Sequence, residues 1–333
     1  MRRIGVVTSG ADCPGLNAAI RAVVRKGLDL GYEVVGVRNG WKGLIKDDVF
    51  VMHKRHVSGI LYLGGSILGS GRWDPFTSES EFEAFQENFK KYSLTSLVVI
   101  GGFASLRIAS RLNEAGYATV GIPATIDNDV SCTESCIGFD SASNFVTESL
   151  DRLHTTASSH HRVMVVEVMG GGSGWIALMG GLAGGADYII TPEIHVSFDD
   201  VVRHIEHRNA AGKNFSIIVI TDCAQVDGMP FTPGDSPQTG VGAKLATEIE
   251  KRANIDSRYT VLGHLQRGGS PTVTDRTLAT RFGYEAVELL KRGEVGKMTA
   301  LKAGLIVPAD MDAATRERRK PDPKLFEYAK LFY

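Results

Sequence analysis

The chain has 333 residues, more than the ~250–300 that one hydrophobic core usually serves, so two domains are expected. It carries 37 Lys and Arg against 38 Asp and Glu, with 43% hydrophobic residues, which excludes a disordered chain and a nucleic-acid-coating protein. No run reaches the ~18 apolar residues of a membrane span. Four cysteines without a CxxC pair, and a start without a signal-peptide pattern, predict a cytoplasmic protein with reduced thiols.

Short β-branched runs alternate with amphipathic segments along the chain. Residues 4–8 predict a strand, 9–15 a turn and 16–30 a helix. The same order returns at 97–100 with a helix over about 105–114, and at 163–168 with a helix from about 175. Further strand-like runs are 34–37, 119–122, 188–190, 217–221 and 260–262. This alternation predicts an α/β protein with two Rossmann-like, doubly wound, mostly parallel sheets.

Glycines follow three of these strands, at 10–15 (GADCPG), 101–102 and 170–172. Ligands of such sheets lie outside the carboxyl ends of the strands, where a helix N-terminus presents free N–H groups to an anion. Glycine-rich turns are also the ordinary way in which α/β proteins turn a corner, so a single loop would indicate little. Three together favour a phosphorylated ligand.

Two nucleotide-binding motifs are absent. No GxxxxGK[ST] occurs, which excludes a P-loop nucleotidase. No GxGxxG follows the first strand, and the second strand ends without an acidic residue for a ribose, which argues against a nicotinamide enzyme. The Pro- and Gly-rich residues 225–240 predict an exposed loop, and the charged tail from Arg316 is expected at the surface.

Two carboxylates, Asp127 and Asp129, follow the strand at 119–122 in the sequence PATIDND. If this segment is extended, both lie on one side of the chain with Thr125, and neither is expected in a core. One could accept the proton that a substrate hydroxyl loses in phosphoryl transfer, and the other could orient the hydroxyls. For an isolated DND sequence, an Asx-rich turn is the preferred alternative.

Six motifs occur in order: residues 4–17 (IGVVTSGADCPGLN), 64–72 (GGSILGSGR), 97–105, 123–129, 158–169 (SSHHRVMVVEVM) and 261–271 (VLGHLQRGGSP). With them the chain resembles the 6-phosphofructokinase family over essentially its whole length. The resemblance implies a homotetramer that transfers a phosphoryl group from ATP, or in some members pyrophosphate, to the 1-hydroxyl of fructose 6-phosphate in glycolysis. It also implies a donor-binding domain (1–138 with about 265–315) and a sugar-phosphate-binding domain (139–264 with about 316–333).

On the sugar side the family pattern is largely present. The resemblance implies that Asp127 is the general base, beside Thr125 and Asp129. Further fructose 6-phosphate contacts would be Met169, Gly170, Asp222, His264, Arg267 and, across a subunit boundary, Arg162 and Arg258. Guanidinium groups suit a phosphate because they bind two oxygens at once and stay charged. Asp222 stands where the family usually has the longer Glu, so one sugar-hydroxyl contact could lengthen.

On the donor side the chain departs from the family. The implied ATP contacts are Gly10, Ala11, Arg72, Trp73, Gly102, Phe103, Ala104 and Ser105. Phe103 replaces an aspartate that serves Mg²⁺ and offers no oxygen ligand. The metal site therefore stays unassigned, with Asp12 as the nearest carboxylate candidate. Gly171 replaces an arginine that would neutralise the transferring phosphoryl group, which leaves Arg72 as a catalytic cation.

The aromatic and small residues of the donor side bear on the choice of donor. Trp41 and Trp73 match positions that are often aromatic and could stack on adenine. Pyrophosphate-using members place Asp and Lys where this chain has Ala104 and Ala124, whereas ATP users place glycines, so the size of alanine favours ATP. The altered loop also predicts weak or absent ATP turnover beside intact sugar-phosphate binding.

A regulatory nucleotide site is partly carried over. Arg21 and Arg25, four residues apart on one helix face, match effector-phosphate contacts, as do Lys54 and Lys213. His154 replaces an arginine there and Asp187 replaces a glutamate. An equal alternative is that Arg21 and Arg25 only expose their charges to solvent on the helix surface and bind no effector.

From the resemblance we expect an ATP-dependent 6-phosphofructokinase. Two alternatives stay open. One is a non-catalytic relative that binds a sugar phosphate as a regulatory subunit, and the other is a different donor or phosphosugar.

Overall fold

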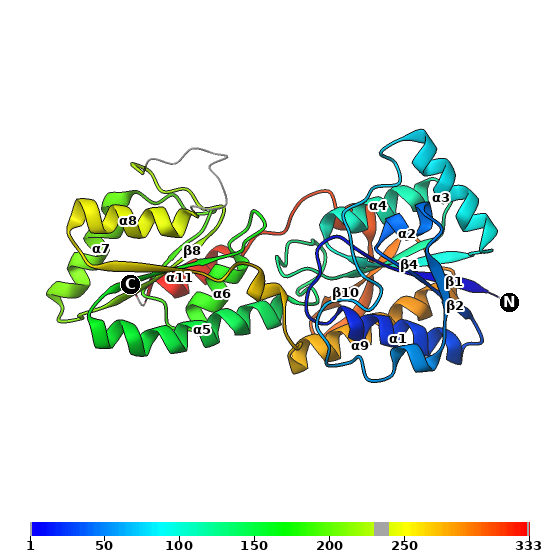
Figure 1. The fold of residues 1–333 in the computed structure, drawn as a ribbon, viewed down its shortest axis with the longest axis horizontal. Coiled ribbons are helices and arrows are strands. Elements are labelled where there is room, and N and C mark those ends of the chain that lie inside the picture. Colours follow the sequence, from blue (N-terminus) through cyan, green and yellow to red (C-terminus); the bar gives the residue numbers. More distant parts are fainter. Residues whose placement is uncertain (1, 230–239, 332) are drawn as a thin grey trace. The chain divides into compact units, whose positions relative to one another are not determined.

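The computed structural model describes residues 2–229, 240–331 and 333, in two compact units (Figure 1). Unit 1 comprises Met1–Ser141 and Arg267–Arg319, and unit 2 comprises Ala142–Gln266 and Lys320–Tyr333. Each unit has its own sheet, which confirms the α/β class with two mostly parallel sheets. Residues 230–239 of the expected loop lie outside the described residues. The assignment of one unit to the donor and the other to the sugar phosphate stays a prediction.

Unit 1 contains a seven-stranded sheet in the order β11-β10-β5-β4-β1-β2-β3. Its parallel strands are β1 (Arg3–Ser9), β2 (Glu33–Val37), β4 (Ser96–Gly101), β5 (Thr119–Pro123) and β10 (Lys297–Lys302). The edge strands β3 (Val49–Met52) and β11 (Leu305–Asp310) pair antiparallel and were not expected from the sequence. After β2 and β3, which lie on one side of β1, the chain crosses to the other side with β4, so a topological switch point lies between β1 and β4.

Helices cover both faces of this sheet (Figure 1). The first face carries α1 (Leu16–Asp29) and α9 (Val273–Arg292), and the other carries α2 (Trp41–Ile45), α3 (Glu79–Lys91) and α4 (Phe103–Glu114). The short α10 (Met311–Ala314) packs on α4, and the 3₁₀ turn η1 (Lys54–Val57) packs on α1. β1 and β4 lie between the two layers and are almost wholly buried, as their unbroken β-branched runs predict.

Unit 2 contains four parallel strands in the order β7-β8-β6-β9. They are β6 (Val163–Val168), β7 (Tyr188–Ile190), β8 (Ser216–Thr221) and β9 (Ser257–Val261), the last of which begins three residues earlier than expected. The helices α7 (Phe198–Ala210) and α8 (Val241–Ala253) share one hydrophobic core with the sheet. The remaining elements are α5 (Phe139–His160), α6 (Trp175–Ala183), α11 (Pro323–Lys330) and the 3₁₀ turn η2 (Gly263–Arg267), which spans the boundary between the units.

The C-terminal tail is not a surface feature throughout, so that expectation is wrong for α11. Phe326 and Ala329 are buried because α11 packs on α6 and β7. The Tyr333 hydroxyl accepts the N–H of Ile189 at 3.2 Å and ties the chain end to β7.

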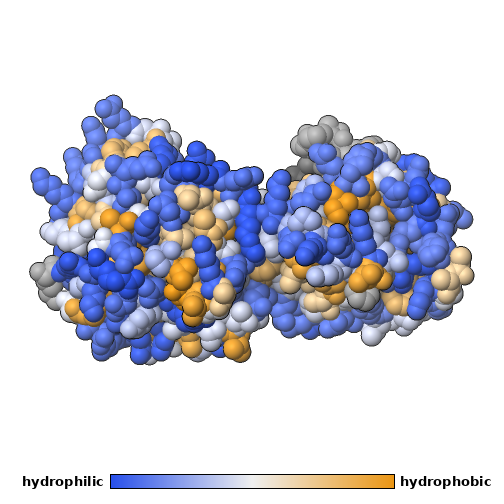
Figure 2. Space-filling view, turned by 180° about the vertical axis from the view of Figure 1, so that it is seen from behind, coloured by the Kyte–Doolittle hydropathy of each residue, from blue (hydrophilic) through white to orange (hydrophobic). Residues whose placement is uncertain are grey.

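The balanced composition predicts a mostly hydrophilic surface. On the face seen in Figure 2, hydrophilic residues cover most of the surface and hydrophobic residues form small, separate groups. No helix of residues 2–229, 240–331 and 333 is both long enough and apolar enough to cross a membrane.

Candidate functional site

Three strand ends meet at the switch point of unit 1. Ser9 of β1 pairs in register with Gly101 of β4, and Gly101 with Pro123 of β5. A Cβ at Gly101 would lie 2.5 Å from the Ser9 carbonyl oxygen, so only glycine permits this approach. A Cβ at Gly102 would lie 3.1 Å from the Thr125 Cβ. The fold therefore brings three predicted segments to one edge: the loop after β1, the Gly-rich turn after β4 and the DND segment after β5.

The predicted donor loop is partly helical. α4 begins at Phe103 rather than at about residue 105, so Phe103 and Ala104 form its first turn. No side chain caps this N-terminus. Ser105 is buried, and its hydroxyl donates to the Ser9 hydroxyl at 3.2 Å. Ser105 therefore fastens the loop to β1, and the first turn of α4 opens toward the strand ends, where a helix favours an anion.

The DND segment forms a turn, which is the alternative considered for it, and is not extended. Asn128 adopts a left-handed backbone with φ of 50°, which breaks the strand alternation between Asp127 and Asp129. The N–H of Asp127 donates to the Thr125 hydroxyl at 3.2 Å, and the Asn128 side-chain oxygen accepts the N–H of Cys136 at 2.9 Å. These bonds hold the turn in place and leave Asp127 half-buried.

Asp129 lies in the interior, contrary to the expectation that neither carboxylate would be in a core. Its side chain is only 2% exposed and pairs with the guanidinium of Arg318. The Arg318 Cζ also lies 4.9 Å from the centre of the Phe103 ring. Burial raises the pKa of Asp129, and the Arg318 charge acts against that rise. No motif or periodicity indicates a role for Arg318, which belongs to a charged run near the C-terminus.

A second arginine is held at the same edge. Arg267 donates through Nη2 to the Asp12 carboxylate and through Nε to the Asp12 carbonyl oxygen at 3.3 Å. The phosphate contact predicted for Arg267 would have to compete with this ion pair. Arg72 differs, because it is exposed and no described residue forms an ion pair or hydrogen bond with it. Its neighbour Gly71 accepts the N–H of Gly10 at 3.0 Å, which sets Arg72 beside the loop after β1.

The two tryptophans of the donor side differ in exposure. Trp41 is fully buried and lies edge-on to Phe85, with ring centroids 6.5 Å apart. The expectation that it could stack on adenine is therefore wrong. Trp73 is partly exposed, and the Lys42 ammonium lies 5.4 Å from its ring centre. Trp73 retains a face that a ligand could use.

The side chains of this edge do not fit a Mg²⁺ ion held by the protein. Phe103 supplies no oxygen, whereas Asp12 and Asp129 are each paired with an arginine. Over the described part of the chain, no three His, Cys, Asp or Glu side chains are grouped so as to hold a metal. In phosphoryl-transfer sites Mg²⁺ is usually held by one or two carboxylates together with waters and substrate phosphates, so a Mg²⁺ ion at this edge would depend mainly on the phosphates of the donor.

In unit 2, the predicted sugar-side residues follow neighbouring strands. Met169 and Gly170 come after β6, and Asp222 comes after β8, whose last residue pairs with Val168. The Asp222 carboxylate accepts the N–H of Gly170 at 3.0 Å. Gly171 has a φ of 58°, a conformation that favours glycine over the arginine usual in the family. This backbone geometry accounts for the glycine there.

Two arginines of unit 2 share one carboxylate. Arg162 contacts Asp256 at 2.5 Å and Arg258 contacts it at 2.8 Å. Arg258 also reaches Glu250 at 3.2 Å. Both guanidinium groups are partly exposed, so together with the exposed His264 they remain accessible to a phosphate.

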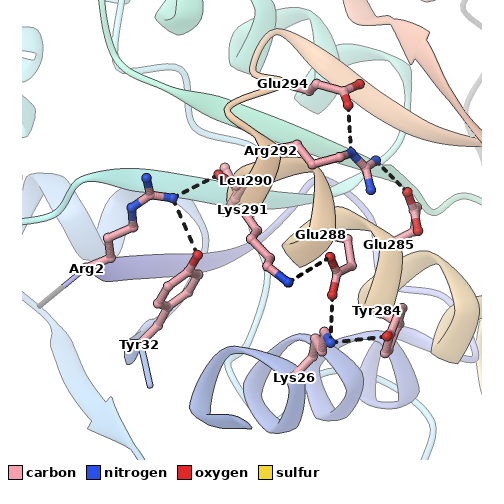
Figure 3. A network of polar contacts seen from close by, with 10 residues as sticks. All are labelled: Arg2, Lys26, Tyr32, Tyr284, Glu285, Glu288, Leu290, Lys291, Arg292 and Glu294. Atoms are coloured by element: carbon pink, nitrogen blue, oxygen red, sulfur yellow. Dashed lines mark hydrogen bonds and ion pairs between the residues drawn. The ribbon is translucent and has the colours of Figure 1, made fainter. Parts of the chain in front are cut away.

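The predicted effector residues of unit 1 come together. Arg21, Arg25 and Lys54 line a cavity of about 360 Å³, and within the described ranges none of them forms an ion pair. Lys26 lines the same cavity and is fixed by the Glu288 carboxylate at 2.7 Å and the Tyr284 hydroxyl at 3.1 Å (Figure 3). The hydrogen bond to Glu288 raises the pKa of Lys26.

Of the effector residues predicted in unit 2, one is exposed and two are engaged in contacts with neighbouring residues. Lys213 is exposed. His154 contacts the Gly184 carbonyl oxygen through Nε2 at 2.8 Å. Asp187 pairs with Arg208 at 2.7 Å and accepts the N–H of Ile217. Asp187 therefore has a structural contact at the position where the family has a glutamate.

Comparisons with known proteins by sequence and by structure agree on one protein family. The sequence model described as Phosphofructokinase matches residues 3–290. In Streptomyces coelicolor, a pyrophosphate–fructose 6-phosphate 1-phosphotransferase is 44% identical over 340 residues, covering 99% of each chain. An ATP-dependent 6-phosphofructokinase 3 of the same organism is 44% identical over 335 residues, covering 98% of each. The T-state phosphofructokinase structure from Pichia pastoris has 31% identity and a TM-score of 0.86 over 94% of this chain, which spans 35% of that one.

Proposed function

Because the chain belongs to the phosphofructokinase family, we propose that it transfers a phosphoryl group to the 1-hydroxyl of fructose 6-phosphate, giving fructose 1,6-bisphosphate in glycolysis. The observation that carries this proposal is the meeting of the DND turn and the first turn of α4 at the switch point. A proton acceptor and an anion-binding helix terminus are the two parts that phosphoryl transfer to an alcohol requires.

In the proposed reaction, Asp127 accepts the proton of the 1-hydroxyl. The sugar oxygen then forms a bond to the terminal phosphorus of the donor, and the bond from that phosphorus to the leaving phosphate breaks. Arg72 lies beside the loop after β1 and stabilises the charge on the transferring group. Thr125 fixes the turn that carries Asp127 through the 3.2 Å bond to its N–H.

The sugar phosphate is proposed to bind unit 2 through Met169, Gly170, Asp222 and His264. Arg162 and Arg258 are proposed to reach the 6-phosphate across a subunit boundary of a homotetramer. Asp256 holds both guanidinium groups near one carboxylate, and a phosphate bound by both arginines would take the place of that carboxylate.

ATP is the proposed donor, since Ala104 and Ala124 are close in size to the glycines of ATP users and lack the Asp and Lys of pyrophosphate users. Pyrophosphate is a second candidate. Relatives named for pyrophosphate are 42–44% identical to this chain, and relatives named for ATP are 40–44% identical.

The test is to mix the protein with fructose 6-phosphate, Mg²⁺ and either ATP or pyrophosphate, and to follow fructose 1,6-bisphosphate by an aldolase-coupled assay. Formation with either donor supports the proposed reaction, and the faster donor identifies the natural one. Thermal stabilisation by fructose 6-phosphate without product from either donor would instead favour the non-catalytic sugar-phosphate-binding protein.

The cavity lined by Arg21, Arg25 and Lys54 is proposed to bind the phosphates of an effector nucleotide. Three cations that form no ion pair with any residue the structure describes support an anionic ligand there. Replacing Arg21 and Arg25 by Ala should abolish any shift in the fructose 6-phosphate saturation curve caused by ADP, while leaving kcat unchanged. A shift of the same size in the variant would refute this site.

A further inference from the structure

Arg72, the proposed catalytic cation, has an exposed side chain that forms no ion pair or hydrogen bond with any described residue. Its aim toward the donor therefore depends on how the backbone on either side of it is held. Before Arg72, the Gly71 carbonyl oxygen accepts the N–H of Gly10 at 3.0 Å, and the Ser70 hydroxyl donates to the Gly10 carbonyl oxygen at 2.8 Å. After it, the chain forms a turn at residues 74–77.

Asp74 organises this turn. One of its carboxylate oxygens accepts the N–H of Phe76 at 2.9 Å, and its carbonyl oxygen accepts the N–H and the hydroxyl of Thr77 at 3.0 and 2.7 Å. The other carboxylate oxygen accepts an N–H of the Arg111 guanidinium at 3.1 Å. Because Arg111 belongs to α4, this ion pair fastens the turn to that helix.

An aromatic contact holds the turn to the same arginine. The Arg111 Cζ lies 4.0 Å from the centre of the Phe76 ring, a distance at which a guanidinium is attracted to an aromatic face. The Phe76 ring also stacks on Phe82 of α3, with ring centroids 4.8 Å apart. Side chains of two helices therefore hold the turn, and Arg111 supplies both an ion pair and a ring contact from α4.

We propose that Arg111 is a positioning residue of the reaction, which holds the segment of Arg72 and Trp73 in place for the donor. This inference rests on the proposed function, because it takes Arg72 as the cation at the transferring phosphoryl group. The first turn of α4, at Phe103, is the proposed place of the donor phosphates. Arg111 lies about 12 Å further along the axis of the same helix, so one rigid element sets both the anion-binding helix end and the segment of Arg72.

The exposure of the ion pair makes this role separable from stability. The side chains of Arg111 and Asp74 are 46% and 36% exposed, and an ion pair in contact with water adds little to the stability of a protein. A catalytic group that is displaced by about 1 Å, by contrast, can lose ~10²-fold in rate. Loss of Arg111 should therefore affect catalysis more than unfolding.

The first test compares kcat and Tm of the wild type and Arg111→Gln, with fructose 6-phosphate and the donor that gives product. Arg111→Gln should lower kcat by ~10-fold, because a small displacement of Arg72 weakens its contact with the transferring group. Its Tm should stay within about 4 °C of that of the wild type. Arg107→Gln is the matched control, since Arg107 is exposed one helical turn earlier on α4 and its side chain forms no ion pair or hydrogen bond with any described residue. It should change neither value.

A double variant shows whether Arg111 acts through Arg72. If it does, Arg72→Gln/Arg111→Gln should have the same kcat as Arg72→Gln, because the position of the segment matters little once the Arg72 guanidinium is gone. A purely structural role would instead give additive losses. A further ~10-fold loss in the double variant, or a wild-type kcat in Arg111→Gln, would overturn the proposal.

Trp73 gives a second measurement, which does not need turnover. Of the three tryptophans it is the partly exposed one, since Trp41 and Trp175 are buried. Quenching of tryptophan fluorescence by acrylamide, a neutral molecule, therefore reports mainly on the segment of Trp73. Arg111→Gln should raise the quenching constant above those of the wild type and Arg107→Gln, because the turn is released from α4.

The two measurements separate this inference from the proposed function. An unchanged quenching constant in Arg111→Gln would overturn the proposal, whether or not the protein is active. A raised constant in a protein that forms no product from either donor would refute the proposed function and leave the positioning of the segment by Arg111 standing.

Discussion

Phe103 changes the chemistry available at the end of β4 because it removes an oxygen ligand and supplies a ring face to Arg318. We predict that Phe103→Asp together with Ala104→Gly makes kcat depend more steeply on Mg²⁺ and raises it substantially, because the restored carboxylate can help to hold Mg²⁺ at the transferring group, where one preorganised charge can be worth ~10²–10³-fold in rate. The measurement is kcat as a function of Mg²⁺ concentration. Phe103→Leu with Ala104→Gly is the control that lacks the carboxylate, and equal behaviour of the two double variants would contradict the prediction.

Arg72 is an exposed cation at the same edge, and it forms no ion pair or hydrogen bond with any described residue. Arg72→Gln should lower kcat by ~10²–10³-fold, the cost of one lost transition-state contact. Its free energy of unfolding should change by less than about 0.5 kcal/mol, as for ordinary surface substitutions. Steady-state kinetics and thermal unfolding measure the two effects. A stability loss that accompanies an unchanged kcat would show that Arg72 is structural.

The residues that the sequence could predict at this site are those in local motifs. Thr125 and Asp127 follow a strand in a short recognisable segment. Arg318 and Asp129 are separated by 189 positions, and no periodicity or turn signal links them. The burial of Asp129 could not be predicted either, since it depends on Asn128 adopting a left-handed conformation and on a partner from the C-terminal segment.

At the scale of the elements, the strands β1, β4 and β6 were predictable, whereas β3 and the hairpin of β10 and β11 were not. The runs at β1, β4 and β6 are apolar and β-branched because both faces of each strand are covered. β10 and β11 join through Ala303 and Gly304, both with positive φ, as in a tight hairpin turn. Alanine is not a residue that indicates such a turn, which is why this hairpin was missed.

Asp275 links the start of α9 to residues 138–141, which belong to the same unit, and gives a prediction at this scale. It accepts the N–H groups of Gly138 and Ser141 at 2.8 Å each and the Ser141 hydroxyl at 2.6 Å, so the start of α9 is tied to the start of α5. Burial raises the pKa of Asp275 from 3.8 to about 6. The folded state therefore holds this proton more tightly than the unfolded state does.

The sign of the pH dependence follows from this raised pKa. Stability from proton binding at Asp275 is fully present below about pH 4 and is lost as the pH rises through 6, by about 3 kcal/mol at most. Asp275→Asn cannot titrate. We predict that the Tm of the wild type minus that of Asp275→Asn falls between pH 4 and pH 7, measured by calorimetry. A difference that stays constant over this range would contradict the raised pKa.

At the scale of the whole molecule, the proposed homotetramer would complete each sugar site with Arg162 and Arg258 of a neighbouring subunit. Asp127→Asn and Arg162→Ala/Arg258→Ala should each be nearly inactive alone. Co-expression should restore part of the activity, because hybrid oligomers contain some sites with neither defect. Light scattering checks that the oligomers are the same size. Failure of co-expression to restore any activity would show that the arginines act within their own subunit or not at all.

The central claim is that Asp127 removes the proton of a sugar-phosphate hydroxyl during phosphoryl transfer. Its most direct test is the rate of fructose 1,6-bisphosphate formation by the wild type and Asp127→Asn, at saturating fructose 6-phosphate with each donor in turn. The account predicts product from at least one donor with the wild type, and a kcat ~10²–10⁴-fold lower in the variant with fructose 6-phosphate affinity retained. Equal kcat values for the two proteins, or no product from the wild type with either donor, would contradict it.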